Sequence, residues 1–343
     1  MTSAKKNIVV LATGGTIAGA GEQGKNIGYK SGSIEAQTLI DAVPELKDVA
    51  NIFVEQVCNI NSDDITSEIW ISLVLRIKEL SKNGFGATHE NVDGFVIMHG
   101  TDTMEETAFF LSLTLGAGEN AAGQNSAKPV VLAGSMRPAT AAEPDGPANL
   151  LFAVRSAVEL SSRNVIPASE PESRRDHHSS FAKSMPVFVA FAGKLMDARS
   201  VQKIHANDLD AFAEVGTARE PLAFARVTKE KSLPKVSVLY FNADADADFV
   251  RFAAERSAGL VIAGAGAGEF SQSWAAAIAD VVAKKIPVVI STRINRGCIV
   301  PEQLLVPGTI AAYDLPPAKA AVLLRLTLTV TREPAEIQKI FNE

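Results

Sequence analysis

The sequence is poor in cysteine, in the larger aromatic residues and in long apolar runs. Its 343 residues include two cysteines, two tryptophans and three tyrosines. Two cysteines make no disulfide framework, and Cys58 and Cys298 both adjoin apolar residues, so we expect buried thiols. No apolar stretch approaches the roughly 18–20 residues that a membrane-spanning helix needs. The chain therefore fits neither a disulfide-stapled domain nor a bundle of membrane helices.

Positive charge is also in short supply. The chain has 33 Lys and Arg residues against 39 Asp and Glu residues, which gives a formal net charge of −6. This balance does not point to nucleic acid or to an anionic membrane as a partner. What is present is an ordinary globular composition, 47% hydrophobic and 21% charged, in a chain long enough for two domains with sizeable cores.

The apolar residues fall into short runs that alternate with helical patterns. Strands are expected at residues 7–11, 52–57, 94–98, 129–133 and 185–191, and helices at residues 33–43, 66–80, 104–115 and 147–160. This alternation predicts βαβ units and a mainly parallel sheet. The fold class is therefore α/β, with a first domain over residues 1–210.

Two stretches interrupt this alternation. Residues 163–183 are polar and contain Pro167 and Pro171, and we expect an exposed loop or a disordered insertion there. Residues 211–233 mix glycine, proline and charge without a clear period, which is typical of an interdomain linker. A smaller α/β domain then covers residues 234–343. Its strands are expected at residues 235–240, 259–263 and 287–291, and its helices near residues 247–257, 272–284 and 317–327.

The most informative segment covers residues 99–107 and reads HGTDTMEET. It lies between an expected strand and an expected helix, at the edge where open α/β sheets bind their ligands. A glycine there allows a tight turn, which presents the next hydroxyl and carboxylate at a helix N-terminus. Taken alone, Thr101 and Asp102 fit a helix cap equally well.

A second turn of the same kind favours a functional site over simple capping. The expected strand at residues 7–11 runs into ATGGTIAG at residues 12–19, which again places a hydroxyl in a glycine-rich turn. Two such turns in one sheet could put Thr16 and Thr101 on opposite walls of one crevice. A free threonine hydroxyl is a poor nucleophile, so a catalytic role requires an assisting base.

Together these two segments resemble the bacterial-type L-asparaginases, close to the type II asparaginases and glutaminase-asparaginases. Further stretches fit the family in its own order: AVPELKD at residues 42–48, AGSMRP at 133–138, DGPANL at 145–150 and QKIFN at 338–342. The resemblance covers almost the whole chain, and motifs that match in this order are highly specific.

The resemblance implies two sets of catalytic residues in the first domain. Thr16 matches the family's acylated threonine, and Tyr29 matches its activating tyrosine. Tyr29 lies in a segment of small residues that suits a mobile lid, the alternative being a long surface loop. Thr101, Asp102 and Lys203 match a second triad, in which a desolvated lysine can act as a base beside an orienting carboxylate.

The resemblance also implies a substrate-binding set. Ser62 and Asp63 match the positions that hold the α-carboxylate and α-amino groups of the substrate, although relatives usually carry Gln or Glu where Asp63 stands. Ser135 falls where relatives use a backbone carbonyl to accept the substrate amide. Gly15 and Gly100 belong to the turns whose backbone N–H groups would stabilise an oxyanion.

Two acidic residues of the second domain enter through the same resemblance. Glu269 ends a glycine-rich turn that, in the family, reaches the site of the neighbouring subunit. Relatives have Asn, Ser or Thr there, so binding of the substrate ammonium and capping of the next helix both remain open. Glu302 is a candidate for a further carboxylate that relatives supply to the site.

The implied function is hydrolysis of L-asparagine to L-aspartate and ammonia through a threonyl acyl-enzyme. L-Glutamine hydrolysis stays open as a side activity. The family needs no cofactor, and the resemblance implies a homotetramer built as a dimer of dimers. Type II relatives are often exported, whereas residues 1–6 precede the first strand without an apolar signal segment. The location is therefore open between the cytoplasm and the periplasm with a signal peptide removed.

Two rival functions rest on weaker patterns. Gly19, Gly21 and Gly24 fit the dinucleotide-binding pattern of an oxidoreductase, but they follow a loop rather than a strand. A non-enzymatic amino-acid-binding protein could use Ser62, Asp63 and Asp102 without turnover. No pair of histidines has the HExxH spacing of a zinc site, so no metal is expected.

Overall fold

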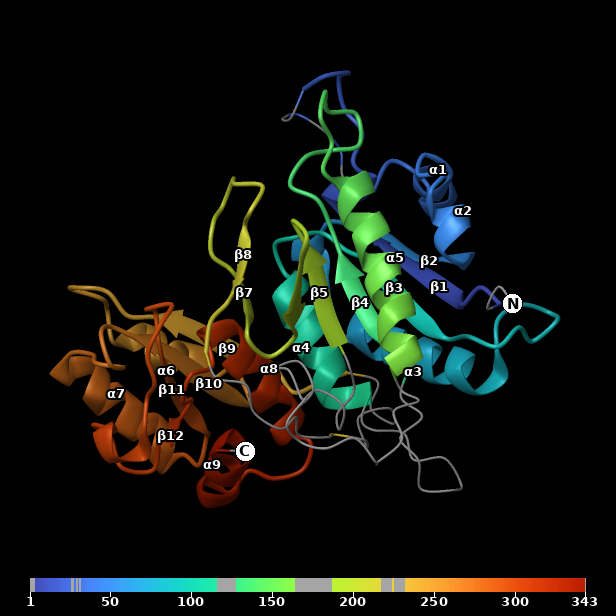
Figure 1. The fold of residues 1–343 in the computed structure, drawn as a ribbon. Coiled ribbons are helices and arrows are strands. Elements are labelled where there is room, and N and C mark those ends of the chain that lie inside the picture. Colours follow the sequence, from blue (N-terminus) through green and yellow to red (C-terminus); the bar gives the residue numbers. More distant parts are fainter. Residues whose placement is uncertain are drawn as a thin grey trace, which may run out of the picture. The chain divides into compact units, whose positions relative to one another are not determined.

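The structure of the chain is a computed structural model that divides into two compact units, residues 1–214 and 215–343 (Figure 1). It describes residues 4–25, 28, 30, 32–115, 128–163, 187–216, 224 and 232–342. Tyr29 and nearly all of the insertion expected at residues 163–183 therefore lie outside the described residues. Each unit is an α/β domain with a sheet of its own.

The first unit is built on a six-stranded sheet in the order β2-β1-β3-β4-β5-β6. Its strands are β1 (Asn7–Gly14), β2 (Asn51–Ile60), β3 (Gly94–Met98), β4 (Val130–Ala133), β5 (Val187–Phe191) and β6 (Lys194–Asp197). All neighbouring pairs are parallel except β5 and β6, which form an antiparallel hairpin. Every residue of β3, β4 and β5 is buried, which is why these strands occur in the sequence as unbroken apolar runs.

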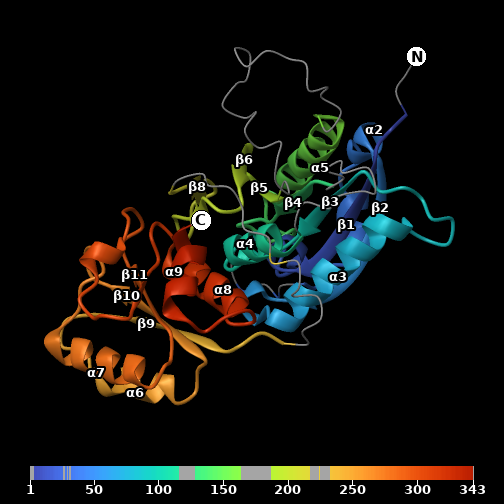
Figure 2. The ribbon, with the colours of Figure 1, turned by 90° about the horizontal axis from the view of Figure 1, so that it is seen from below.

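Helices cover both faces of this sheet, as Figure 2 shows. One face packs against α1 (Ala36–Asp41), α2 (Leu46–Val49) and α5 (Gly146–Arg163). The other face carries α3 (Ser67–Asn83) and α4 (Met104–Leu115). The rings of Trp70 in α3 and Phe110 in α4 stack with their centroids 5.0 Å apart. The α3–α4 pair therefore forms a second layer of core next to the turn that follows β3.

A small two-stranded sheet is separate from the six-stranded one. β7 (Val201–Lys203) pairs antiparallel with β8 (Phe212–Glu214), and Lys203 lies opposite Phe212. β8 falls within residues 211–233, the expected linker, so the first part of that segment is a strand of the first unit. The domain bounds expected from the sequence remain a prediction.

The second unit has a four-stranded parallel sheet in the order β12-β11-β10-β9. Its strands are β9 (Val236–Tyr240), β10 (Gly259–Gly264), β11 (Val288–Thr292) and β12 (Ile310–Ala311), and its helices are α6 (Asp248–Ala254), α7 (Gln272–Ala283), α8 (Pro317–Thr327) and α9 (Pro334–Asn342). Val250 of α6 and Trp274 of α7 pack into the core on one face of this sheet. α8 contacts β9 and β10, and α9 contacts β12 and α8.

The expected fold class is confirmed: the first unit has a mainly parallel sheet, and the second is a smaller α/β domain. β3, α4 and α8 begin and end at the expected residues.

The prediction of buried thiols is wrong for Cys298, which is exposed in the irregular segment after β11, where its neighbour Ile299 turns inward instead. Cys58 is partly buried, which raises the pKa of its thiol. Within the described residues, no helix has the length and apolar character needed to cross a bilayer.

Replacing Phe110 with alanine is expected to lower the free energy of unfolding of the first unit by about 3–5 kcal/mol, because the ring is fully buried and stacks on Trp70. Urea unfolding followed by fluorescence in a Trp274→Phe background measures this loss, since Trp70 is then the one indole left. Leu75→Ala, at an exposed position of α3, is the control and should change stability by less than about 0.5 kcal/mol. Equal midpoints for the two variants would contradict the assigned α3–α4 core.

Candidate functional site

Three turns at the carboxyl ends of β1, β2 and β3 converge at one place. Gly15 follows β1, Ser62 follows β2 and Gly100 follows β3. A Cβ atom on Gly15 would lie 2.4 Å from Gly100 Cα, and a Cβ atom on Gly100 would lie 2.7 Å from Ser62 Oγ. Real Cβ atoms do not come so close to other atoms, so only glycine lets these turns touch. Thr16 and Thr101 are the residues that directly follow the two glycines.

A change of register brings the first turn to this place. Ala12 of β1 pairs with Gln56 of β2, but Gly14 pairs with Ile60, so three residues of β2 stand opposite the single residue Thr13 of β1. The Gly15 N–H then donates to the Ile60 carbonyl at 2.9 Å. Gly15 has a φ of 81°, a conformation that strains other residues. Thr16 begins a short 3-10 helix, Thr16–Ala18, immediately after it.

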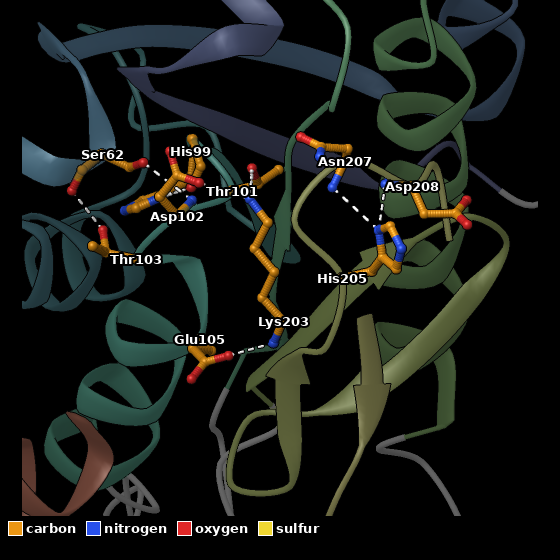
Figure 3. A network of polar contacts seen from close by, with 11 residues as sticks. Ser62, His99, Thr101, Asp102, Thr103, Glu105, Lys203, His205, Asn207 and Asp208 are labelled. Carbon is orange, nitrogen blue, oxygen red and sulfur yellow. Dashed lines mark hydrogen bonds and ion pairs between the residues drawn. The ribbon is translucent and has the colours of Figure 1, made fainter. Parts of the chain in front are cut away.

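Lys203 reaches the turn after β3 from the separate β7–β8 sheet (Figure 3). Its Nζ donates to Thr101 Oγ1 at 2.9 Å and to Asp102 Oδ1 at 2.6 Å. Thr101 is buried and the lysine side chain is only 16% exposed, whereas the Asp102 side chain is 66% exposed. Such a half-exposed ion pair adds little to stability. The arrangement is instead suited to proton exchange between the amine and the hydroxyl, with the carboxylate balancing the ammonium.

Ser62 joins the turn after β2 to the turn after β3. Its Oγ accepts a hydrogen bond from the Asp102 N–H at 3.2 Å, and its carbonyl accepts one from Thr103 Oγ1 at 2.6 Å (Figure 3). Ser62 is buried, but Asp63 beside it is exposed. The accessible carboxylates of Asp63 and Asp102 are thus carried on turns that Ser62 holds together.

The turn after β4 is held by the residue that precedes α5. The two carboxylate oxygens of Asp145 accept hydrogen bonds from the Met136 N–H and the Arg137 N–H, each at 2.9 Å. Ser135 is completely buried, and its hydroxyl donates to the Arg137 carbonyl at 2.7 Å. The Ser135 carbonyl and the Met136 N–H belong to one planar peptide, so the contact with Asp145 also fixes the direction of that carbonyl.

His99 supports the turn after β3 from inside the protein. Trp70 Nε1 donates to Thr107 Oγ1 at 2.8 Å, and Thr107 Oγ1 lies 2.9 Å from His99 Nε2. His99 Nδ1 lies 2.7 Å from the Gly100 carbonyl. Because a carbonyl only accepts, Nδ1 carries the proton and the Thr107 hydroxyl donates to Nε2. Desolvation lowers the pKa of His99 to about 4, against the opposing effect of the Gly100 carbonyl, so the ring is neutral near pH 7.

The structure brings most of the expected site residues to one edge of the first unit. The turns after β1 to β4 and the end of β7 carry Gly15, Thr16, Ser62, Asp63, Gly100, Thr101, Asp102, Ser135 and Lys203. Glu269 and Glu302 are exposed residues of the second unit, which is described by itself. The turn that contains Glu269 is closed by a bridge between Ala265 and Glu269. Within the described parts of the chain, no group of His, Cys, Asp and Glu residues could hold a metal ion.

No sequence pattern assigns a role to Glu105 or Asp145. Glu105 accepts a hydrogen bond from the Lys203 backbone N–H at 2.5 Å. In the sequence, Glu105 stands where an acid is expected merely to favour a helix N-terminus. Asp145 lies in the DGPANL stretch, whose presence marks the family without indicating a contact. Glu105 of α4 binds a backbone N–H of β7, and Asp145 binds two backbone N–H groups of the turn after β4. Residue types alone do not indicate such backbone partners.

The fold and the site define an α/β protein with threonine and aspartate side chains at the carboxyl ends of parallel strands, and a lysine that reaches them from a separate two-stranded sheet. Residues 7–166 match the family model described as asparaginase, N-terminal, and residues 235–341 match the model of the glutaminase/asparaginase C-terminal domain. The chain belongs to the asparaginase family, and the resemblance stated from the sequence is confirmed.

Individual relatives agree over nearly the full length. The chain is 36% identical to L-asparaginase 2 of Bacillus subtilis, with 98% of this chain and 86% of the relative covered. It is also 36% identical to a probable periplasmic L-asparaginase of Haemophilus influenzae, with 98% and 93% covered. The crystal structure of a probable cytoplasmic L-asparaginase from Campylobacter jejuni has a TM-score of 0.78 and 35% identity, with 99% and 100% of the two chains covered.

The neutral state of His99 gives a prediction for stability against pH. Its pKa is about 4 in the folded protein and about 6.5 when unfolded, so its contribution is complete above pH 6.5 and is lost as the pH falls toward 4. The stability advantage of the wild type over His99→Asn should therefore shrink by about 2 kcal/mol between pH 7 and pH 5. Urea midpoints of both proteins across this range provide the measurement. Parallel stability curves would show that His99 keeps an ordinary pKa.

Proposed function

We propose that this protein is an L-asparaginase that converts L-asparagine to L-aspartate and ammonia through an acyl-enzyme on Thr16. The observation that carries the proposal is the position of Lys203 Nζ, 2.9 Å from Thr101 Oγ1 and 2.6 Å from Asp102 Oδ1. A protein that only binds an amino acid does not need a largely buried amine in hydrogen-bond contact with a hydroxyl, because it transfers no proton. That contact favours the enzyme over the non-enzymatic binding protein.

Acylation is the first half of the reaction. Thr16 Oγ1 forms a bond with the side-chain amide carbon, and the hydroxyl proton is transferred, with the help of Tyr29, toward the departing amide nitrogen. Backbone N–H groups of the turns around Gly15 and Gly100 stabilise the oxyanion, each well-placed donor contributing roughly 3–4 kcal/mol. The C–N bond then breaks, ammonia leaves, and a β-aspartyl ester remains on Thr16.

Deacylation uses the second set of residues. Thr101 and Lys203 accept a proton from a water molecule, whose oxygen bonds to the ester carbon. The bond from that carbon to Thr16 Oγ1 breaks, Thr16 regains its proton, and aspartate is released. Asp102 balances the ammonium that Lys203 becomes when it holds the proton. No step requires a cofactor.

The remaining residues hold the substrate, which is a small amino acid. Ser62 and Asp63 bind its α-carboxylate and α-amino groups, and the Ser135 carbonyl accepts the amide NH₂. Glutamine is one methylene longer than asparagine, and discrimination of a single methylene in a pocket is worth only about 1–3 kcal/mol. We therefore expect asparagine to be preferred and glutamine to be hydrolysed at a detectable rate.

The working assembly we propose is a homotetramer made of two close dimers. Glu269 lies on an exposed strand-end turn of a unit that carries none of the threonine, lysine and aspartate set. Such a turn is suited to completing the pocket of a neighbouring subunit. The cellular location stays a prediction, either cytoplasmic or periplasmic.

Thr16→Ala is expected to lower the kcat for asparagine by several orders of magnitude while aspartate still binds, because the change removes the nucleophile and little of the amino-acid clamp. The rate is measured as ammonia release, and aspartate binding by calorimetry. Thr38→Ala, at an exposed position of α1, is the matched control and should keep the wild-type rate. More than about a tenth of the wild-type kcat left in Thr16→Ala would remove Thr16 from this role.

The active species should have the mass of a tetramer at the concentration of the assay. Light scattering coupled to size exclusion, with ammonia release measured on the eluted fractions, tests this expectation. Glu269→Gln should preserve the mass and change the KM for asparagine if this turn reaches a neighbour's site. An active monomer would refute the shared site.

A further inference from the structure

Lys203 does not belong to the sheet whose turns it serves. It is the last residue of β7, a strand of three residues that pairs with β8 in a separate two-stranded sheet. Thr101 and Asp102 instead follow β3, in the middle of the six-stranded sheet. The β-ladders therefore do not fix the lysine backbone relative to the hydroxyl that its amine must meet.

Glu105 connects the Lys203 backbone to the segment that follows β3. Its carboxylate oxygen Oε2 accepts the Lys203 backbone N–H at 2.5 Å, as Figure 3 shows at the base of the lysine side chain. Glu105 lies in the first turn of α4, three residues after Asp102. One short segment thus holds both ends of the lysine, since Asp102 binds Nζ and Glu105 binds the backbone.

The physical need for such a contact follows from the lysine side chain. Its long, flexible carbon chain can adopt many rotamers, so an unfixed backbone would spread Nζ over many positions. A hydrogen bond from a backbone N–H to a carboxylate is roughly twice as strong as one between neutral groups. Holding the backbone restricts Nζ to the positions from which it reaches Thr101 Oγ1.

We propose that Glu105 is a positioning residue for Lys203, which acts by fixing the lysine backbone so that the amine meets the Thr101 hydroxyl. The proposal rests on the function proposed above and adds a residue that need not touch the substrate. The competing explanation is stabilisation of the helix N-terminus by negative charge. Glu106 shares that first turn, so a role in the helix dipole would extend to both acids.

Two conservative variants of Glu105 separate the effect of side-chain length from the effect of side-chain charge. Glu105→Gln keeps the length of the side chain and an acceptor oxygen but removes the charge. Glu105→Asp keeps the charge but is one methylene too short to reach the Lys203 N–H. If the contact positions the lysine, Glu105→Asp should lower kcat for asparagine by about 10- to 100-fold, the loss expected of a misplacement near 1 Å. Glu105→Gln should stay within about threefold of the wild type, and both should leave aspartate inhibition within about twofold.

Glu106→Asp and Glu106→Gln are the matched controls, because they make the same changes one residue further along the helix. Both are expected to keep the wild-type kcat within about threefold. A wild-type kcat in Glu105→Asp would overturn the proposal. So would an equal loss in Glu105→Gln, because a side chain of the native length with an acceptor oxygen would then not be enough. A parallel loss of aspartate binding would also overturn it, because it would indicate general damage to the site.

Amide hydrogen exchange at Lys203 provides a readout that does not depend on activity. Exchange of this N–H should be at least about tenfold faster in Glu105→Asp than in the wild type, and should change less in Glu105→Gln. An unchanged rate in Glu105→Asp would refute the contact even if asparagine were not the substrate. Conversely, the wild type could release no ammonia from asparagine while exchange is still faster in Glu105→Asp. That result would support the contact and reject the proposed function.

Discussion

Gly15 and Gly100 meet backbone to backbone at the ends of β1 and β3, and the functional groups of both turns depend on that contact. An atom placed at either Cβ position would lie well inside the contact distance of the opposite turn or of Ser62. The two threonines follow these glycines directly, so their separation is set by main chain packed against main chain. A wider spacing at this point would move Thr16 away from Thr101 without disturbing either strand.

The buried network behind this contact gives the turn a fixed direction. Trp70, Thr107 and His99 form a chain of hydrogen bonds that ends on the Gly100 carbonyl. That carbonyl shares a peptide plane with the Thr101 N–H, so the network also fixes the direction of this N–H. A neutral imidazole is needed, since it has to donate at one nitrogen and accept at the other. Among the described residues, no buried side-chain polar atom lacks a hydrogen-bond partner.

The sequence predicted the parts of the fold whose residues are governed by burial. β3 and α4 are predicted residue for residue because β3 is apolar throughout, and because α4 comes soon after a turn glycine and has acidic residues in its first turn. β7 and β8 were not predicted, because strands of three residues carry too few side chains for a period. The insertion after α5 and Tyr29 fall where the structure gives no description.

For the site, motif and resemblance indicated candidate residues but not how the protein holds them. Thr101 and Asp102 stand out because a hydroxyl and a carboxylate follow a strand-end glycine. Glu105 does not stand out, since its partner is a backbone N–H and an N–H has no signature in the sequence. Cys298 shows the same limit, because an apolar neighbour does not decide which of two adjacent side chains turns inward.

The distance along the chain between the parts of the site has a consequence for folding. Thr101 and Lys203 are 102 positions apart, and Ser62 and Asp102 are 40 apart, so the site is built from contacts that close long loops. Such contacts form late and slowly compared with local ones. A nascent chain that ends before β7 already contains both threonines and all five parallel strands of the first sheet, yet it has no amine to place against the hydroxyl. Secondary structure can therefore be nearly complete in this unit while its chemistry is still absent.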